Sequence, residues 1–257
     1  MRPRDSGTVV WVDLTTPGVE AAGDFYADLL GWTLTVAETD MGRYHVAAVA
    51  DRATAGLMAP GPDEAEPSPA WSVYIGVDDL EHSLARITAA GGVVRVPPMD
   101  IPGGARIAVV ADPAGAQFVV IGRFAAEELP APTTPGALHW AEVMSRDPAI
   151  ARQFYTEVFG WRADTSAAGG MPYTIFAQGD RPVAGLMGMP AEVPAEAPSH
   201  WLGYFAVADA EGAVERAEDL GGKVAAGVRE VPGGRFAVLE DPAGAVFAVF
   251  EPVDASA

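Results

Sequence analysis

The chain has 257 residues, 49% of them hydrophobic and 20% charged, a length that accommodates one large or two modest globular domains. It contains no cysteine, which excludes disulfides, thiolate nucleophiles and cysteine-ligated zinc, and which fits a reducing cytoplasm. Its 35 acidic residues outnumber its 16 basic ones, and the net charge of −19 argues against nucleic acid and anionic membranes as partners. No apolar run suits a signal peptide or a membrane span, so we expect a cytoplasmic protein.

The first sixty residues alternate between strand and helix patterns. We expect a strand, a helix and three further strands, at residues 8–14, 19–30, 33–37, 43–50 and 55–58. Phe25 and Tyr26 lie on the apolar face of the helix, and Gly31 ends it. The sequence Asp40-Met41-Gly42 predicts a hairpin turn, and the proline-rich residues 60–69 predict a loop.

The same order of elements begins again at residue 71. A strand at residues 71–77 precedes a helix that Asp79 caps and that stops at Gly91-Gly92. Three short strands follow, at residues 93–96, 105–111 and 116–122. The first 129 residues therefore contain two modules of β-α-β-β-β order.

The second half of the chain repeats the first. The run Asp-Pro-Ala-Gly-Ala occurs at 112–116 and again, 129 residues later, at 241–245. All six tryptophans and all six tyrosines form pairs separated by 129 or 130 residues, which chance does not explain. We expect a first domain at residues 1–129, a linker at 130–136 and a second domain at 137–257.

Several of these motifs together resemble the vicinal oxygen chelate superfamily, which comprises glyoxalases, bleomycin-resistance proteins and extradiol dioxygenases. They are Thr-Pro-Gly at 16–18, Phe-Tyr at 25–26, Gly-Trp at 31–32, Val-Asp-Asp-Leu at 77–80 and the Asp-Pro-Ala-Gly turns. The tandem form, with Pro-Pro-Met-Asp-Ile-Pro-Gly-Gly at 97–104, is similar to a bacterial subgroup labelled "hydroxylase" or glyoxalase-like antigen.

The resemblance covers nearly the whole chain and implies a specific architecture. It implies an α+β fold of two tandem domains, each a half-open β-barrel made of two βαβββ modules around a pocket. It does not fix the activity, because this fold hosts metal enzymes, metal-free binders and sequestering proteins.

Metal-dependent members of the family bind a divalent ion through His, Gln or Glu at matching strand positions. Counting from the helix and turn motifs, we place those positions at Trp11, Met58, Ser72 and Val119 in the first domain and Trp140, Met187, Leu202 and Ala248 in the second. A shift of one residue brings His139 or Glu251 near but completes no ligand set. We therefore expect no metal and no other cofactor.

Strand alternation places the acids Asp13 and Glu142 on the same faces as the tryptophans two residues before them. These two carboxylates are the candidate catalytic residues. The candidate ligand-binding residues are Trp11, Tyr44, Ser72, Tyr74, Trp140, Tyr173, His200, Leu202, Tyr204 and Ala248. A carboxylate desolvated beside an indole has a raised pKa and can act as a general base, and a tyrosine can stabilise an enolate-like oxyanion. In the alternative interpretation the acids anchor loop backbone and the tyrosines belong to the core.

Three further residues carry polar groups near the expected pockets. Arg106 and Arg235 follow the paired glycines before the last hairpin, where an arginine holds a carboxylate or phenolate or forms a structural salt bridge. His200 lies two residues before Leu202 and faces the rim of the second pocket, whereas Ala70 occupies the matching position of the first.

The leading hypothesis is a metal-independent protein that binds a small hydrophobic or aromatic ligand, as a monomer or a homodimer. It sequesters an aromatic or polycyclic metabolite or assists its biosynthesis. One alternative is a cofactorless isomerase, lyase or cyclase that uses a pocket carboxylate and a tyrosine. A second is a metal-dependent glyoxalase or dioxygenase.

Overall fold

The computed structural model describes residues 7–39, 42–61, 68–122, 129–167 and 171–253. Two residues of the predicted turn, 40 and 41, and the part of the predicted loop at 62–67 lie outside the described residues. Among the described residues, no helix is long and apolar enough to cross a membrane.

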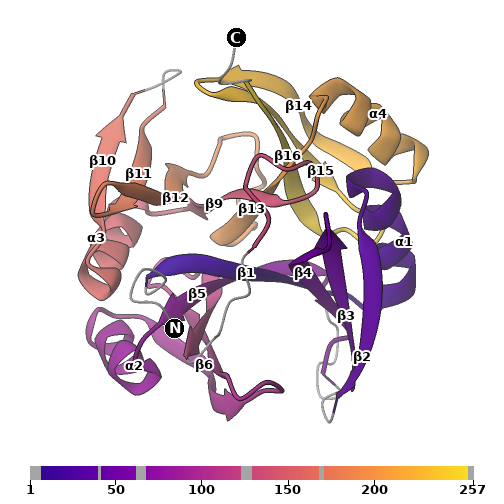
Figure 1. The fold of residues 1–257 in the computed structure, drawn as a ribbon. Helices are drawn as coiled ribbons and strands as arrows, with labels where there is room; N and C mark the ends of the chain where they lie inside the picture. The colour runs from indigo at the N-terminus through magenta and orange to yellow at the C-terminus, as the bar shows by residue number, and fades with distance from the viewer. Residues whose placement is uncertain (1–6, 40–41, 62–67, 123–128, 168–170, 254–257) are drawn as a thin grey trace. The chain divides into compact units, whose positions relative to one another are not determined.

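The four predicted β-α-β-β-β modules are all present (Figure 1). The first repeat contains β1 (Thr8–Thr15), α1 (Val19–Leu30), β2 (Thr33–Thr39), β3 (Gly42–Val49), β4 (Arg52–Met58), β5 (Ala70–Val77), α2 (Leu80–Ala89), β6 (Val93–Asp100), β7 (Arg106–Ala111) and β8 (Gln117–Gly122). The second contains β9 (Leu138–Ser145), α3 (Pro148–Phe159), β10 (Arg162–Ser166), β11 (Tyr173–Gln178), β12 (Arg181–Gly188), β13 (His200–Ala206), α4 (Ala210–Asp219), β14 (Lys223–Val231), β15 (Gly234–Glu240) and β16 (Val246–Pro252).

Local sequence explains where these elements begin and end. Helices α1 and α3 stop at Gly31 and Gly160, which adopt left-handed φ angles of 71° and 70° that other residues rarely adopt. Strand β6 is longer than predicted and continues through Pro97-Pro98 to Asp100. Proline is tolerated there because β6, which pairs with β7, is an edge strand of its sheet among the described residues.

The sixteen strands form two sheets of eight strands. Their orders are β2-β3-β4-β1-β5-β8-β7-β6 and β10-β11-β12-β9-β13-β16-β15-β14. Within each module the first strand pairs in parallel with the last, as β1 does with β4, and the remaining pairs are antiparallel hairpins. Among the described strands each order has two ends, so the sheets are half-open and not closed barrels. The predicted α+β fold of tandem βαβββ modules is therefore confirmed.

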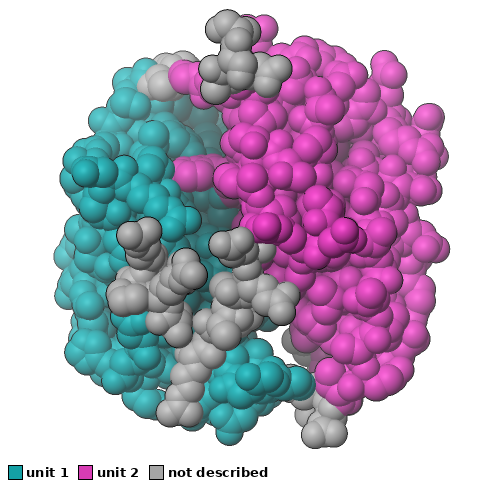
Figure 2. Space-filling view, viewed as in Figure 1, with its two compact units in different colours: residues 1–10, 72–126, 141–202 teal, residues 11–71, 127–140, 203–257 magenta. Residues whose placement is uncertain are grey.

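The compact units of the chain do not coincide with its sequence repeats (Figure 2). Unit 1 comprises residues 1–10, 72–126 and 141–202, and unit 2 comprises residues 11–71, 127–140 and 203–257. Each unit therefore combines one module of the first repeat with one module of the second. In unit 1 helix α2 packs against α3, and in unit 2 helix α1 packs against α4 (Figure 1).

A buried hydrogen-bonded group in unit 2 joins the two repeats. Trp71 Nε1 donates to the Tyr26 hydroxyl at 3.0 Å, and that hydroxyl donates to Asp241 Oδ2 at 3.2 Å. The other oxygen of Asp241 accepts from the backbone N–H groups of Ala243 and Ala245, which shapes the Asp-Pro-Ala-Gly turn. The Asp241 turn of the second repeat is thus hydrogen-bonded to helix α1 of the first repeat.

Unit 1 contains the reciprocal arrangement. Trp201 Nε1 donates to the Tyr155 hydroxyl at 3.1 Å, and the turn residue Asp112 lies beside Tyr155 and accepts from Ala116 N at 2.9 Å. Burial, followed by the nearby aspartate charge, raises the pKa of the Tyr155 hydroxyl well above its usual value, and the same causes act on Tyr26. Both tyrosines therefore remain protonated donors.

Candidate functional site

Trp11, Asp13 and Tyr44 form a hydrogen-bonded group within unit 2. Trp11 Nε1 donates to Asp13 Oδ1 at 2.7 Å and also lies 2.9 Å from the Tyr44 oxygen. The Tyr44 hydroxyl donates to the same Asp13 Oδ1 at 2.6 Å. The Asp13 side chain comes from the middle of β1 and is only 3% exposed, whereas Trp11 and Tyr44 are half-buried. A buried carboxylate oxygen is thus held between an indole and a phenol.

Gly56 makes this group possible. It lies directly opposite Asp13 across the β1–β4 pairing. A methyl group at position 56 would lie 1.9 Å from the Tyr44 hydroxyl oxygen and 2.1 Å from Asp13 Oδ1. Because Gly56 has no side chain, the phenol of Tyr44 can cross β4 at this position and reach Asp13.

The protonation of Tyr44 follows from its surroundings. Burial raises the pKa of the Tyr44 hydroxyl well above its usual value, and the negative charge of Asp13 raises it further. Tyr44 therefore keeps its proton at physiological pH and acts as a hydrogen-bond donor.

Glu142 and Tyr173 form the corresponding pair in unit 1. The Tyr173 hydroxyl donates to Glu142 Oε2 at 2.8 Å, and Glu142 is 3% exposed. Glu142 pairs with Gly185 across β9 and β12, as Asp13 pairs with Gly56. The two repeats thus place a buried carboxylate, a tyrosine and a strand glycine in equivalent positions.

The remaining predicted residues are distributed between the two units. Ser72, Tyr74, His200 and Leu202 belong to unit 1, and Trp140, Tyr204 and Ala248 belong to unit 2. Tyr204 lies opposite Ala248 across β13 and β16, with the Phe236 ring centre 5.9 Å away. The hydrogen bonds described above join Tyr44 to Asp13 and Tyr173 to Glu142.

The two arginines form salt bridges, which is one of the two roles expected for them. Arg106 pairs with Glu81 at 2.9 Å, and Arg235 pairs with Glu211 at 2.6 Å and Glu251 at 2.5 Å.

The sequence interpretation missed the strand glycines. Ala-Gly-Leu-Met occurs at 55–58 and again at 184–187, and both copies carry a glycine at the same place in a strand. A glycine inside a strand commonly marks the close approach of another group, and here that group is Tyr44 over Gly56. This repeated glycine was the signal that could have revealed the contact.

Comparison with known proteins identifies the family. The family model described as the glyoxalase/bleomycin resistance protein/dioxygenase superfamily matches residues 8–120 and again residues 137–249. This chain belongs to that superfamily. The two matched segments correspond to the two sequence repeats.

Two curated relatives of the superfamily resemble the chain over nearly its whole length. The anthracycline biosynthesis protein DnrV of Streptomyces peucetius is 37% identical, covering 95% of this chain and 93% of that protein. The putative glyoxylase CFP32 of Mycobacterium bovis is 36% identical, covering 96% of this chain and 95% of that protein.

Solved structures of the superfamily share the fold. The Mn(II)-bound glyoxalase from Novosphingobium aromaticivorans has a TM-score of 0.66 at 16% identity, over 97% of this chain and 83% of that one. The 2,2',3-trihydroxybiphenyl 1,2-dioxygenase of Sphingomonas wittichii has the same TM-score at 15% identity, over 96% of this chain and 90% of that one. At such identities the likeness concerns the fold alone.

The positions at which we expect the metal ligands of the superfamily carry no imidazole and no carboxylate in this chain. They carry indole, thioether, hydroxyl and aliphatic side chains: Trp11, Met58, Ser72, Val119, Trp140, Met187, Leu202 and Ala248. Mn(II) and Zn(II) prefer imidazole and carboxylate donors. Two buried carboxylates each lie two residues after one of these positions: Asp13 Oδ1 already accepts two hydrogen bonds, and Glu142 Oε2 accepts one from Tyr173.

Acidic side chains gather elsewhere in the described residues. Asp209, Glu211 and Glu251 bring one carboxylate oxygen each within 4.8 Å of one another. Arg235 forms ion pairs with all three, which supplies the positive charge that a metal ion would otherwise bring.

Proposed function

We propose that this protein binds an aromatic or polycyclic metabolite without using a metal ion, and that it sequesters this metabolite or assists a step in its biosynthesis. The observation that carries the proposal is the pairing of buried carboxylates with tyrosine, and in unit 2 with an indole, on the strands of both repeats. Such aromatic side chains offer stacking surfaces, and the hydroxyl and carboxylate groups offer orienting hydrogen bonds. Relatedness to a protein named for anthracycline biosynthesis supports a polycyclic ligand.

The proposal is tested by calorimetric titration of an anthracycline aglycone into the full chain, with chromatography of the mixture afterwards. We expect saturable binding and recovery of unchanged aglycone. Trp11→Ala and Trp140→Ala should each weaken binding by about tenfold if the respective site is used, because each removes one stacking surface. Val36→Ala, which trims a side chain that is 46% exposed on β2, is the control and should bind normally. Equal affinity of all four proteins, or no binding at all, contradicts the proposal.

A second candidate function is a cofactorless isomerase, lyase or cyclase. The favouring observation is that Tyr44 remains protonated and lies 2.6 Å from the buried Asp13, so a proton acceptor and a proton donor lie together. A substrate that displaces this hydrogen bond would meet a base in Asp13 and an oxyanion donor in Tyr44. If the chain converts the aglycone, Asp13→Asn or Glu142→Gln should abolish turnover while the protein remains folded. Turnover that survives in both variants excludes this mechanism.

A further inference from the structure

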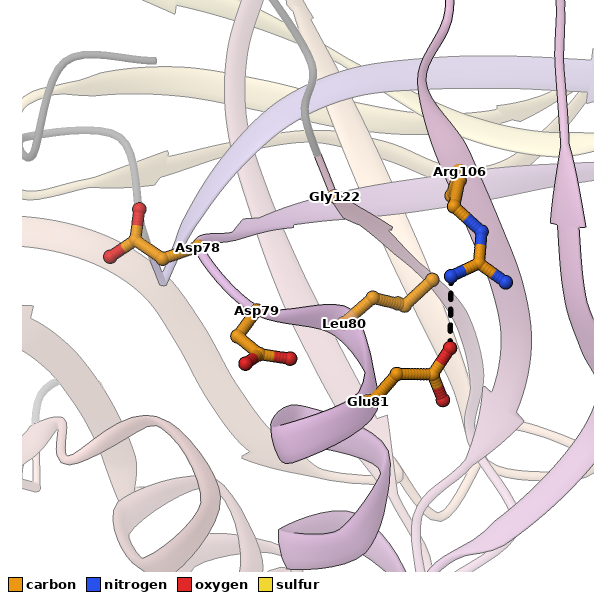
Figure 3. A pocket seen from close by; sticks show the side chains of 6 residues that line it. All are labelled: Asp78, Asp79, Leu80, Glu81, Arg106 and Gly122. Atoms are coloured by element: carbon orange, nitrogen blue, oxygen red, sulfur yellow. Dashed lines mark hydrogen bonds and ion pairs between the residues drawn. The ribbon is translucent and has the colours of Figure 1, made fainter.

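A hollow of about 230 Å³ lies where α2 begins and β8 ends, entirely within unit 1 (Figure 3). Six residues line it: Asp78, Asp79, Leu80, Glu81, Arg106 and Gly122. Arg106 lies directly opposite Gly122 across the β7–β8 pairing. Figure 3 shows the guanidinium of Arg106 joined to Glu81 in the first turn of α2, with Gly122 on the neighbouring strand.

The equivalent place in the second repeat is filled by a carboxylate of the chain itself. There Arg235 lies opposite Glu251 across the β15–β16 pairing, just as Arg106 lies opposite Gly122. Glu251 Oε2 accepts from Ala210 N at 2.8 Å and from Arg235 Nη2 at 2.5 Å. The first N–H of α4 and an arginine fork thus bind one carboxylate.

In the first repeat, a side chain at position 122 would point toward the N-terminus of α2, as Glu251 points toward that of α4. A methyl group at position 122 would lie 3.2 Å from Leu80 Cβ and 3.8 Å from Leu80 N, which is the first N–H of α2. Leu80 corresponds to Ala210, 130 residues later in the sequence. The hollow is therefore the space that the Glu251 side chain occupies in the second repeat.

Arg106 has weaker partners than Arg235, because Gly122 stands where the second repeat has Glu251. Arg106 pairs with Glu81 at 2.9 Å and with Asp100 at 3.3 Å, and the Asp100 side chain is 86% exposed. An ion pair with so exposed a partner contributes little and is readily exchanged. A guanidinium can hold two carboxylates at once, as Arg235 does with Glu211 and Glu251.

The acidic neighbours of the hollow are compatible with a bound carboxylate. Asp79 caps α2 by accepting from His82 N at 3.0 Å, and Glu81 is paired with Arg106. The exposed Asp78, which corresponds to Ala208 in the second repeat, adds a negative charge to the rim and lowers the affinity for an anion. The corresponding acids of the second repeat, Asp209 and Glu211, stand beside Glu251, which nevertheless binds its two donors. A helix N-terminus favours such an anion through its oriented N–H groups.

We propose that the hollow beside Gly122 is a binding site for a small monocarboxylate, held by Leu80 N–H and the Arg106 guanidinium in the way that Glu251 is held in the second repeat. The ligand has a single negative charge and a compact body, because the rim is acidic and the volume is small. This site is separate from the carboxylate–tyrosine groups described above. It gives the first repeat a ligand position that the second repeat closes with its own side chain.

The test is a titration of the ¹⁵N-labelled full chain with sodium acetate, with sodium chloride at matched ionic strength as the reference. We expect saturable shifts of the Leu80 amide and the Arg106 side-chain N–H signals, with a Kd on the order of millimolar. Gly122→Glu supplies the carboxylate from the chain and should remove the response. Glu251→Gly opens the second hollow and should add a response at the Ala210 amide.

Two further variants keep the test decisive if one of these fails to fold. Leu80→Ala combined with Gly122→Glu reproduces the Ala210–Glu251 pair of the second repeat and removes the Leu80 side-chain atoms beyond Cβ from the lining of the hollow. Arg106→Gln keeps Gly122 and should weaken acetate binding by tenfold or more. The proposal is overturned if acetate shifts Leu80 no more than chloride does, or if Gly122→Glu responds like the parent. A response to Mg²⁺ in place of acetate also overturns it.

Discussion

Replacing Gly56 by alanine tests the geometry of the Trp11–Asp13–Tyr44 group. The new methyl group would lie 1.9 Å from the Tyr44 oxygen and 2.1 Å from Asp13 Oδ1, well inside ordinary contact distance. Tyr44 must swing away, which adds strain of about 1–3 kcal/mol and breaks hydrogen bonds to a carboxylate worth roughly 1.5–3 kcal/mol. We therefore expect Gly56→Ala to lower the free energy of unfolding by roughly 2.5–6 kcal/mol in total.

The assay is differential scanning calorimetry, in which a loss of this size lowers the Tm by about 5 °C or more for a chain of this length. Gly227→Ala is the matched control, since Gly227 lies on β14 with no heavy atom within 4 Å of the added methyl group. It should change stability by less than about 0.5 kcal/mol. In a Tyr44→Ala background the cost of Gly56→Ala should shrink, because one of the two clashes is gone. A Gly56→Ala protein that melts with the parent would refute this reasoning.

Two further outcomes follow from the structure. Tyr26→Phe and Tyr155→Phe should each lower stability by roughly 3 kcal/mol in urea titrations, because each leaves a buried tryptophan N–H without its acceptor; a loss under about 0.5 kcal/mol contradicts the buried networks. Burial lowers the pKa of His139, whose ring stacks on Phe250 at 4.3 Å, so below about pH 6.5 the unfolded chain binds more protons than the native one. Stability should therefore fall as the pH drops from about 6.5 through the lowered pKa, and in His139→Gln this part of the pH dependence should disappear; an unchanged pH profile counts against it.

Much of the fold follows from the sequence, because the periodicities and the punctuating glycines are local signals. The glycines that end the helices at 31 and 160, together with the two Asp-Pro turns, are enough to delimit the four modules. The pairing of Tyr26 with Asp241 is different. Tyr26 could meet the Asp-Pro-Ala-Gly turn of either repeat, and because the two turns are identical in sequence, self-similarity cannot distinguish them.

Part of the candidate site could likewise be predicted from the sequence. Alternation along β1 places Trp11 and Asp13 on one face, and the matching positions of Tyr44 and Tyr173 were apparent from the repeat. The hydrogen bond between Tyr44 and Asp13 was not, because it depends on Gly56 in a neighbouring strand and on a register that only the folded sheet defines. Likewise, the sequence does not show that Gly122 lies opposite Arg106. The hollow beside Gly122 is recognised only when this pair is compared with Glu251 opposite Arg235 in the second repeat.

Metal dependence of ligand binding tests the central claim most directly. The full chain, treated with chelator and dialysed, is titrated calorimetrically with an anthracycline aglycone, without and with added Mn(II). The account predicts the same Kd in both titrations, because the positions where we expect the metal ligands carry Trp11, Leu202 and other side chains that offer no imidazole or carboxylate. Binding or turnover that appears only when Mn(II) is present would contradict it.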